Sequence, residues 1–266
     1  PHPGHRGGRE ESGSLQNALF MTNPSHSGDR RRAGGERAGG PDVFPRPPIV
    51  TYHFGMHGHE DIRIGTLVPA HDRSAEVIRQ LLPHGFETFQ LSFGKSLGAA
   101  DLGTLAADVR RVLDSYPVGS HDLPRRISAV GVYGNPLTSP ETVRDWERLI
   151  DAAADFGCDV VSGFAGRIPG RPVPESFGRF GEVFRPLARR AEDRGVRLAF
   201  ENCEARGTWD SGDRNIAHAP RAWEAMFAEV ESAVVGLEWE PCHQIVSFVD
   251  PLPQLRKWAH RVWHIH

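Results

Sequence analysis

The 266-residue sequence lacks the long apolar segments that membrane proteins need. No run of 18 apolar residues occurs, and the first residues carry no apolar stretch of the secretory kind. We therefore expect no membrane-spanning segment and no membrane partner. Cysteine is also scarce, because only Cys158, Cys203 and Cys242 occur and none forms a CxxC pair. So few thiols, odd in number, favour a reduced cytoplasmic protein over a disulfide-bonded secreted one.

The sequence has no excess of one charge. It contains 31 basic and 34 acidic residues, and its formal net charge is −3. Proteins that bind nucleic acid or anionic membranes through their bulk charge need a basic excess, so we expect neither partner. Glycine-rich turns of the GxGxxG or GxxxxGK[ST] type are absent too, which counts against an open nucleotide-binding sheet.

Residues 1–48 differ in composition from the rest of the chain. They are rich in Gly, Arg, Pro and Ser, as in GDRRRAGGERAGGPD. Such a segment buries too little apolar surface to offset the entropy lost on ordering, so we predict a disordered arm. A basic arm that binds nucleic acid is the alternative, but acidic residues interrupt the arginines. The folded domain is then expected over residues 49–266.

From about residue 60 onward, short apolar segments alternate with amphipathic ones. Seven strands are expected, at residues 62–69, 86–93, 127–133, 159–164, 197–204, 234–243 and 262–266. Six helices separate them, at about residues 73–82, 101–115, 140–157, 175–194, 220–232 and 252–260. Ser139 is the expected cap of the third helix, Gly157 its expected end, and Pro186 a candidate kink in the fourth. This alternation predicts a parallel sheet with helices outside it.

Two architectures fit the alternation: a (β/α)8 barrel and an open doubly wound sheet. A barrel gathers its functional residues at the carboxyl ends of its strands, and three of the expected strands end in residues that bind metals. We therefore predict an α/β fold of the (β/α)8 TIM-barrel type. A whole barrel has eight strands and the sequence shows seven, so we expect an incomplete barrel, truncated at its C-terminus. Unpaired strand edges favour association between chains, so a homo-oligomer is one of the expected alternatives.

The three metal-binding residues are Glu201 in RLAFENCE, Glu240 in VVGLEWEPCH and His266 in VWHIH. Side chains alternate along a strand and neighbouring strands lie about 4.8 Å apart, so these three are expected to meet above the barrel. Two carboxylates and an imidazole suit a divalent metal ion. The oxygen-rich set favours Mn²⁺ or Mg²⁺, with Co²⁺ or Zn²⁺ as alternatives. His243 follows Glu240 closely, where it can reach substrate or metal.

Each of these residues also has a purely structural interpretation. A single glutamate at a strand end is usually solvated or salt-bridged. His264 is expected to pack beside the site rather than to bind an ion, and most tryptophans are expected in the core or the pocket wall. Ligand-type residues at three consecutive strand ends are less easily explained without a shared ion.

The three motifs resemble the xylose isomerase-like TIM-barrel superfamily, specifically its sugar phosphate isomerase/epimerase group. ENCE resembles the fifth-strand Glu-Asn, and GLEWEPCH the sixth-strand segment, with Glu240 where Asp is commoner. VWHIH resembles the seventh-strand segment whose second histidine is a ligand. GTWDSGDRNIAHAPRAWEAMF resembles the loop and helix after the fifth strand in one branch. The resemblance covers about residues 60–266 and specifies the substrate only weakly.

The resemblance implies a divalent-metal-dependent sugar or sugar phosphate isomerase/epimerase that transfers a proton through an enediolate. It implies four metal ligands: Glu201, Glu240, His266 and a glutamate from an eighth strand, which has no counterpart in the sequence. Glu201 is then also the catalytic acid or base. Gln90 stands where many members carry Glu, which is expected to alter polar contacts in the pocket floor.

The remaining expected site residues bind the substrate, a small sugar or cyclitol. His243 is expected to hydrogen-bond a substrate oxygen during catalysis, and Asn202 to orient Glu201 or touch the substrate. Trp209 and His218, in the loop after the fifth strand, are expected to cover the pocket and exclude water.

Three other functions stay open at this point. A metal-dependent inosose-type dehydratase starts with the same proton abstraction and then expels a hydroxyl group. An endonuclease IV-like phosphodiesterase needs a histidine-rich multi-zinc site and a basic groove, which the balanced charge disfavours. An inactive barrel fragment lacking the strand-eight ligand is the non-enzymatic alternative.

Overall fold

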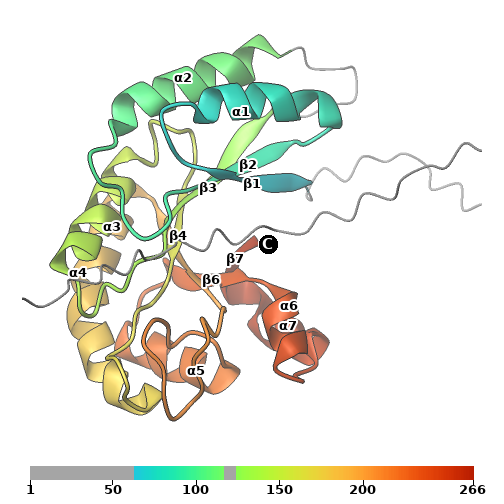
Figure 1. Ribbon diagram of the computed structural model, residues 1–266. Helices are drawn as coiled ribbons and strands as arrows, with labels where there is room; N and C mark the ends of the chain where they lie inside the picture. Colours follow the sequence, from blue (N-terminus) through green and yellow to red (C-terminus); the bar gives the residue numbers. More distant parts are fainter. Residues whose placement is uncertain (1–62, 117–123) are drawn as a thin grey trace, which may run out of the picture. The chain divides into compact units, whose positions relative to one another are not determined.

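The computed structural model describes residues 63–116 and 124–266, and the predicted N-terminal arm lies outside them. Within the described residues, seven parallel strands form one curled sheet in sequence order (Figure 1). The strands are β1 (Gly65–Pro69), β2 (Thr88–Ser92), β3 (Arg126–Val132), β4 (Val160–Gly163), β5 (Arg197–Glu201), β6 (Val235–Trp239) and β7 (Val262–Ile265). The predicted TIM-barrel type of fold and its seven strands are confirmed.

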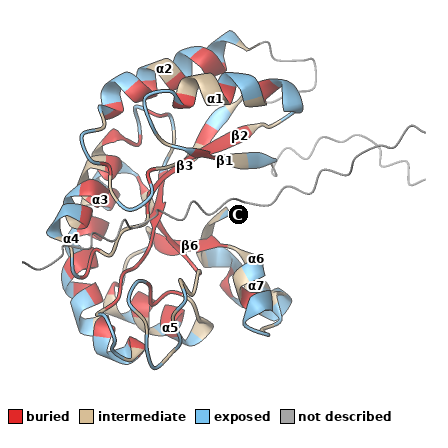
Figure 2. Ribbon diagram, in the orientation of Figure 1, coloured by how far each residue is buried: buried red, intermediate tan, exposed pale blue. Residues whose placement is uncertain are grey.

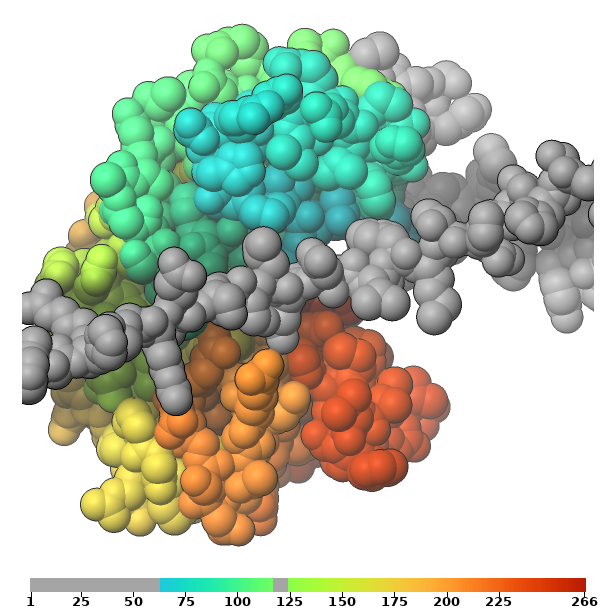
Figure 3. Space-filling model, viewed as in Figure 1, coloured from blue at the N-terminus to red at the C-terminus, as the bar shows by residue number. Residues whose placement is uncertain are grey.

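Helices follow the strands and lie around the outside of the curled sheet (Figure 1). They are α1 (Ser74–Leu81), α2 (Leu102–Ser115), α3 (Pro140–Ala152), α4 (Phe177–Arg194), α5 (Pro220–Glu229), α6 (Pro241–Val246) and α7 (Pro251–Trp258). Short 3₁₀ turns at Leu82–His84, Val173–Ser176 and Ala259–Arg261 complete the described elements. Viewed as in Figure 3, the C-terminal elements (orange to red) lie opposite the first β/α units (blue to green).

Local sequence explains where the third and fourth helices begin and end. The Ser139 hydroxyl accepts a hydrogen bond from the Thr142 amide, so the predicted cap of α3 is confirmed. The predicted end at Gly157 is wrong: α3 ends at Ala152, and a run of turns reaches Gly157, whose φ of 71° suits glycine. Helix α4 continues through Pro186 over 18 residues.

Two predicted strands are shorter than expected. β5 ends at Glu201 and β6 at Trp239, so Cys203 and Cys242 do not continue the strand alternation. The sequence prediction also missed α6, which begins directly after Glu240. Proline at the first helical position explains this start, because its fixed φ suits a helix and its missing N–H is not needed there.

Side-chain alternation on β5 separates the core from the site. Phe200 is fully buried against Trp146, Phe180 and Phe184 beneath the helices, with ring centroids 4.7–5.9 Å apart. Its neighbours Ala199 and Glu201 lie on the opposite face of the strand. Figure 2 shows that the central strands are almost wholly buried, as expected for a parallel sheet covered by helices.

The described helices are all either too short or too polar to cross a lipid bilayer.

The aromatic cluster gives a direct test of the core. Phe200→Ala is expected to lower the free energy of unfolding by about 3–5 kcal/mol, because it removes a ring packed among three others. Phe248→Ala is the matched control, since Phe248 is 99% exposed and its loss is expected to cost less than about 0.5 kcal/mol. Urea denaturation followed by circular dichroism measures both; equal effects would contradict the packing described.

Candidate metal centre

The ends of β5, β6 and β7 bring together the three predicted metal ligands. Glu201 is the last residue of β5, Glu240 directly follows β6, and His266 directly follows β7. One carboxylate oxygen from each glutamate and one ring nitrogen of His266 lie within 4.8 Å of one another. The three side chains line a cavity of about 340 Å³ at the carboxyl edge of the sheet.

The two ring nitrogens of His266 face different partners. Nδ1 lies 3.5 Å from Glu240 Oε2, on the side of the predicted ligands. Nε2 lies 3.3 Å from Glu238 Oε1 and hydrogen-bonds the Gln90 side-chain oxygen. Histidines that bind metals usually donate their second N–H to a carboxylate or carbonyl oxygen, which fixes the ring and its tautomer. The surroundings of His266 match that arrangement.

A buried polar layer lies beneath the three side chains. Its centre is Glu238 on β6, whose side chain is fully buried. The Gln90 amide donates to Glu238 Oε1 at 2.7 Å, and the Tyr133 hydroxyl donates to Glu238 Oε2 at 2.9 Å. The Gln90 side chain therefore connects Glu238 to His266 in the pocket floor, where the sequence predicted that it affects polar contacts.

Histidines complete the partners of Glu238. His264 Nδ1 lies 3.4 Å from Glu238 Oε1, and its Nε2 lies 3.0 Å from the Ser128 hydroxyl oxygen. Burial disfavours the carboxylate, but the neighbouring imidazoles of His264 and His266 outweigh it and hold the pKa of Glu238 at about 2. Glu238, His264 and His266 also offer ligand atoms within 4.8 Å of one another, and the packing role expected for His264 stays a prediction.

His243, on the first turn of α6, is surrounded by carboxylates. Its Nε2 lies 3.1 Å from Glu240 Oε2 and 3.5 Å from Glu201 Oε1, while Nδ1 lies 2.9 Å from Glu204 Oε2. Hydrogen bonds with Cys203, Glu201 and Glu240 raise the pKa of His243 well above its usual range. In return, His243 and His266 hold the pKa of Glu240 well below its usual range.

Glu201 differs from Glu240 in its electrostatic surroundings. It is 9% exposed, and burial raises its pKa although the hydrogen bond from His243 opposes that shift. A carboxylate with a raised pKa accepts and returns protons near neutral pH more effectively than a fully solvated one. This environment suits the acid–base role expected for Glu201.

Asn202 makes a different contact from the two expected of it. It is fully buried, its Nδ2 donates to the Glu240 carbonyl oxygen at 2.9 Å, and its Oδ1 accepts from the Glu240 amide at 2.6 Å. The side chain therefore extends the pairing of β5 with β6 by one residue and fixes the backbone of Glu240. Contact of Asn202 with a substrate stays a prediction.

Asn215 is a site-supporting residue that the sequence prediction missed. It is 1% exposed, and its Nδ2 donates to the carbonyl oxygens of Glu201 and Cys203, each at 2.8 Å. Its Oδ1 accepts from the amides of Ala165 and Ala217, each at 3.2 Å. One amide side chain thus ties the loop after β5 to the loop after β4. Its position between Arg214 and Ile216 gives no periodic signal of this role.

Trp209 and His218 lie in the loop between β5 and α5, as predicted. The Arg221 guanidinium stacks 3.4 Å from the centre of the Trp209 ring. Burial and the charge of Arg167 lower the pKa of His218 to about 4, so the ring is neutral at physiological pH. Among the described residues, neither side chain lines the 340 Å³ cavity, and their covering role stays a prediction.

The donor set fits a divalent metal ion. Two carboxylates and one imidazole provide hard oxygen ligands and a borderline nitrogen ligand, a combination that Mn²⁺, Mg²⁺, Co²⁺ and Zn²⁺ all accept. Glu201, Glu240 and His266 would hold the ion, and Glu238 and Gln90 would orient His266 from below.

A comparison with protein families agrees with this fold. Residues 78–266 match the Xylose isomerase-like TIM barrel family. The chain belongs to this family. A sequence search against curated proteins finds no match.

Solved structures share this fold at low sequence identity. An L-ribulose 3-epimerase is 16% identical, with a TM-score of 0.59 over 77% of this chain and 69% of its own. A D-allulose 3-epimerase from Methylomonas sp., solved in complex with D-allulose, is 17% identical, with a TM-score of 0.57 over 77% of this chain and 71% of its own. The probable 3-DHS dehydratase AsbF from Bacillus anthracis is 12% identical, with a TM-score of 0.57 over 77% of this chain and 72% of its own.

The link between Asn202 and Glu240 gives a test of the site's framework. In Asn202→Asp, the carboxylate cannot donate to the Glu240 carbonyl oxygen, so the free energy of unfolding is expected to fall by about 1–3 kcal/mol. Mn²⁺ affinity is expected to fall as well, because the Glu240 backbone loses its anchor. Urea denaturation and Mn²⁺ titration measure the two effects. Asp210→Asn, at an exposed position, is the control. If the Asn202→Asp protein had the same stability and Mn²⁺ affinity as this control, the proposed role of the Asn202–Glu240 hydrogen bonds would be contradicted.

Proposed function

We propose that the protein is a divalent-metal-dependent isomerase or epimerase of sugars or sugar phosphates. The observation that carries this proposal is the convergence of Glu201, Glu240 and His266 within 4.8 Å, beside a cavity of about 340 Å³. The family and the sugar epimerases among the structures that share its fold support the same class of reaction. A volume of this size suits a small carbohydrate.

Proton transfer next to a carbonyl group is the reaction that these side chains serve. Glu201 removes a proton from the carbon beside the substrate carbonyl, and an enediolate forms. Return of the proton to the neighbouring carbon completes an isomerisation, whereas an epimerisation needs a second acid that delivers a proton to the opposite face. Its buried position and raised pKa support that role. A divalent ion held by Glu201, Glu240 and His266 would supply Lewis-acid stabilisation for the substrate oxygen on which negative charge develops.

His243 positions the substrate in this proposal. Its Nδ1 donates to Glu204, which orients the ring and leaves Nε2 directed toward Glu201 and Glu240. From there it donates a hydrogen bond to a substrate oxygen. Trp209 and His218 cover the bound sugar from the loop after β5.

A dehydratase acting on a keto-cyclitol or a related ketone is the second candidate. The similarity in fold to a probable 3-DHS dehydratase favours it specifically. Both reactions begin when Glu201 removes a proton, but the dehydratase then expels a hydroxyl group as water. Mass spectrometry of the product distinguishes them, because loss of water excludes an isomerisation.

The expected partners follow from the same site. A small sugar or cyclitol is the proposed ligand, and the balanced charge gives no support for nucleic acid. The three free cysteines support a cytoplasmic location. A homo-oligomer stays open.

Solvent exchange tests the proposed proton transfer. Ketoses such as D-allulose, incubated in D₂O with the Mn²⁺-loaded protein, are expected to gain deuterium at the carbon beside the carbonyl. Exchange requires a single base, so it tests the role of Glu201 without the need for a second acid. Glu201→Gln is expected to lower the exchange rate about 10²–10⁴-fold, as measured by NMR.

Further variants distinguish the loss of the catalytic base from the loss of metal binding. His266→Ala is expected to reduce Mn²⁺ binding, whereas Glu175→Gln, at an exposed carboxylate that does not line the cavity, leaves both binding and exchange intact. Unchanged metal content in both Glu201→Gln and His266→Ala would refute the site. Exchange that persists in Glu201→Gln would refute the assigned base.

A further inference from the structure

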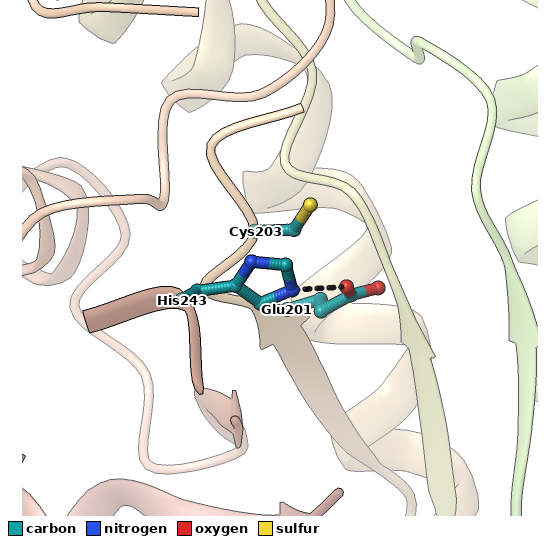
Figure 4. A group of neighbouring side chains, drawn as sticks. All are labelled: Glu201, Cys203 and His243. Atoms are coloured by element: carbon teal, nitrogen blue, oxygen red, sulfur yellow. Dashed lines mark ion pairs between the residues drawn. The ribbon is translucent and has the colours of Figure 1, made fainter. Parts of the chain in front are cut away.

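A second group of metal-ligand atoms lies beside the first and contains sulfur. A carboxylate oxygen of Glu201, Cys203 Sγ and a ring nitrogen of His243 lie within 4.8 Å of one another (Figure 4). The three come from the end of β5, the loop that follows it and the first turn of α6. Glu201 therefore belongs to two groups of donors, one with Glu240 and His266 and one with Cys203 and His243.

Hydrogen bonds from neighbouring residues hold this second group in place. Asn215 Nδ2 donates to the Cys203 carbonyl oxygen at 2.8 Å, and the Ala205 amide donates to Cys203 Sγ at 3.3 Å. The carboxylate of Glu204 orients the His243 ring through the 2.9 Å contact with Nδ1. Donors that are already positioned lose little conformational entropy when they bind an ion.

The local charge leaves room for a second cation. Glu201, Glu204 and Glu240 all lie within 3.5 Å of His243, so three carboxylates surround one imidazole. Glu238 adds a fourth carboxylate in the layer below. These four carboxylates favour positive charge at this edge of the sheet, and a metal ion that displaces the His243 proton keeps positive charge among them.

We propose that Glu201, Cys203 and His243 form a second cation position that selects a thiophilic divalent ion of the Zn²⁺ class. Sulfur is the deciding ligand, because thiolates favour Zn²⁺ and its heavier analogues over Mn²⁺ and Mg²⁺. Carboxylate, thiolate and imidazole are the three ligand types that Zn²⁺ takes in proteins, and three of them leave a fourth tetrahedral position open. The thiol proton leaves to solvent when the metal–sulfur bond forms.

Occupation of this position has a consequence that rests on the proposed function. Glu201 is the assigned base and His243 the assigned substrate contact, so a thiophilic ion takes both away from the sugar. Low concentrations of Zn²⁺ are therefore expected to inhibit the Mn²⁺-loaded enzyme, and Cys203→Ser is expected to relieve that inhibition.

Titration of the whole chain with Cd²⁺ alone tests the binding site independently of activity. Cadmium bound to a thiolate gives an ultraviolet charge-transfer band that cadmium bound to oxygen and nitrogen does not. The wild-type protein is expected to gain this band with one equivalent of Cd²⁺, and Cys203→Ser to lose it. Cys158→Ser is the matched control, because Cys158 hydrogen-bonds the Ala153 carbonyl oxygen away from this edge and its loss leaves the band unchanged.

The second control is Cys242, which donates to Glu240 Oε1 at 3.0 Å and forms its own group with Glu240 and His243. A band that survives in Cys203→Ser, or that is lost in Cys242→Ser, overturns the proposal. Absence of the band in the wild-type protein overturns it as well. Circular dichroism shows whether the Cys203→Ser protein is folded, and Mn²⁺ titration shows whether it keeps the first site. His243→Gln is an independent variant, which is expected to bind Cd²⁺ at least 10-fold more weakly than the wild-type protein.

Failure of this proposal and failure of the proposed function are distinguishable. If the wild-type protein shows the cadmium band but no deuterium exchange with any ketose, the second site is supported and the assigned reaction is refuted. If the protein exchanges deuterium but shows no cadmium band, the assigned reaction is supported and the second site is refuted.

Discussion

Parallel pairing of β5 with β6 fixes the geometry on which the site depends. The two strands run in the same direction with Glu201 opposite Glu238, so their carboxyl ends meet at one edge. Asn202 continues this pairing beyond the strands through its two hydrogen bonds with the Glu240 backbone. A carboxylate from each strand is thereby held toward the same cavity, and β7 adds His266 beside them.

The meeting of Glu201, Glu240 and His266 was predictable, because it follows from short-range periodicity. Apolar runs with alternating faces located the strand ends, and those ends share one edge of any parallel sheet. The placement of Glu201, Glu240 and His266 required no knowledge of loops. The start of α6 was also encoded locally, in Pro241, but the long apolar run before it favoured a longer strand.

The supporting layer was not predictable, because its contacts join residues far apart in the chain. Gln90 and Glu238 are 148 residues apart and meet only when the sheet curls. A buried glutamate on a strand looks the same in sequence as a solvated one, and its histidine partners come from a different strand. Asn215 presents the same difficulty, since its four hydrogen bonds depend on where two separate loops lie.

Gln90 has a consequence for the Lewis acidity of the proposed metal centre. Its side chain is neutral, and the family resemblance implies a glutamate at this place in many members. An ion held above Gln90 would therefore feel one formal negative charge fewer, in a buried setting where charges are weakly screened. Such an ion would withdraw more electron density from a substrate oxygen, and the protein would bind it less tightly. Exchange of one oxygen for one nitrogen in the pocket floor would thus increase the electrophilic power of the ion at the expense of its affinity.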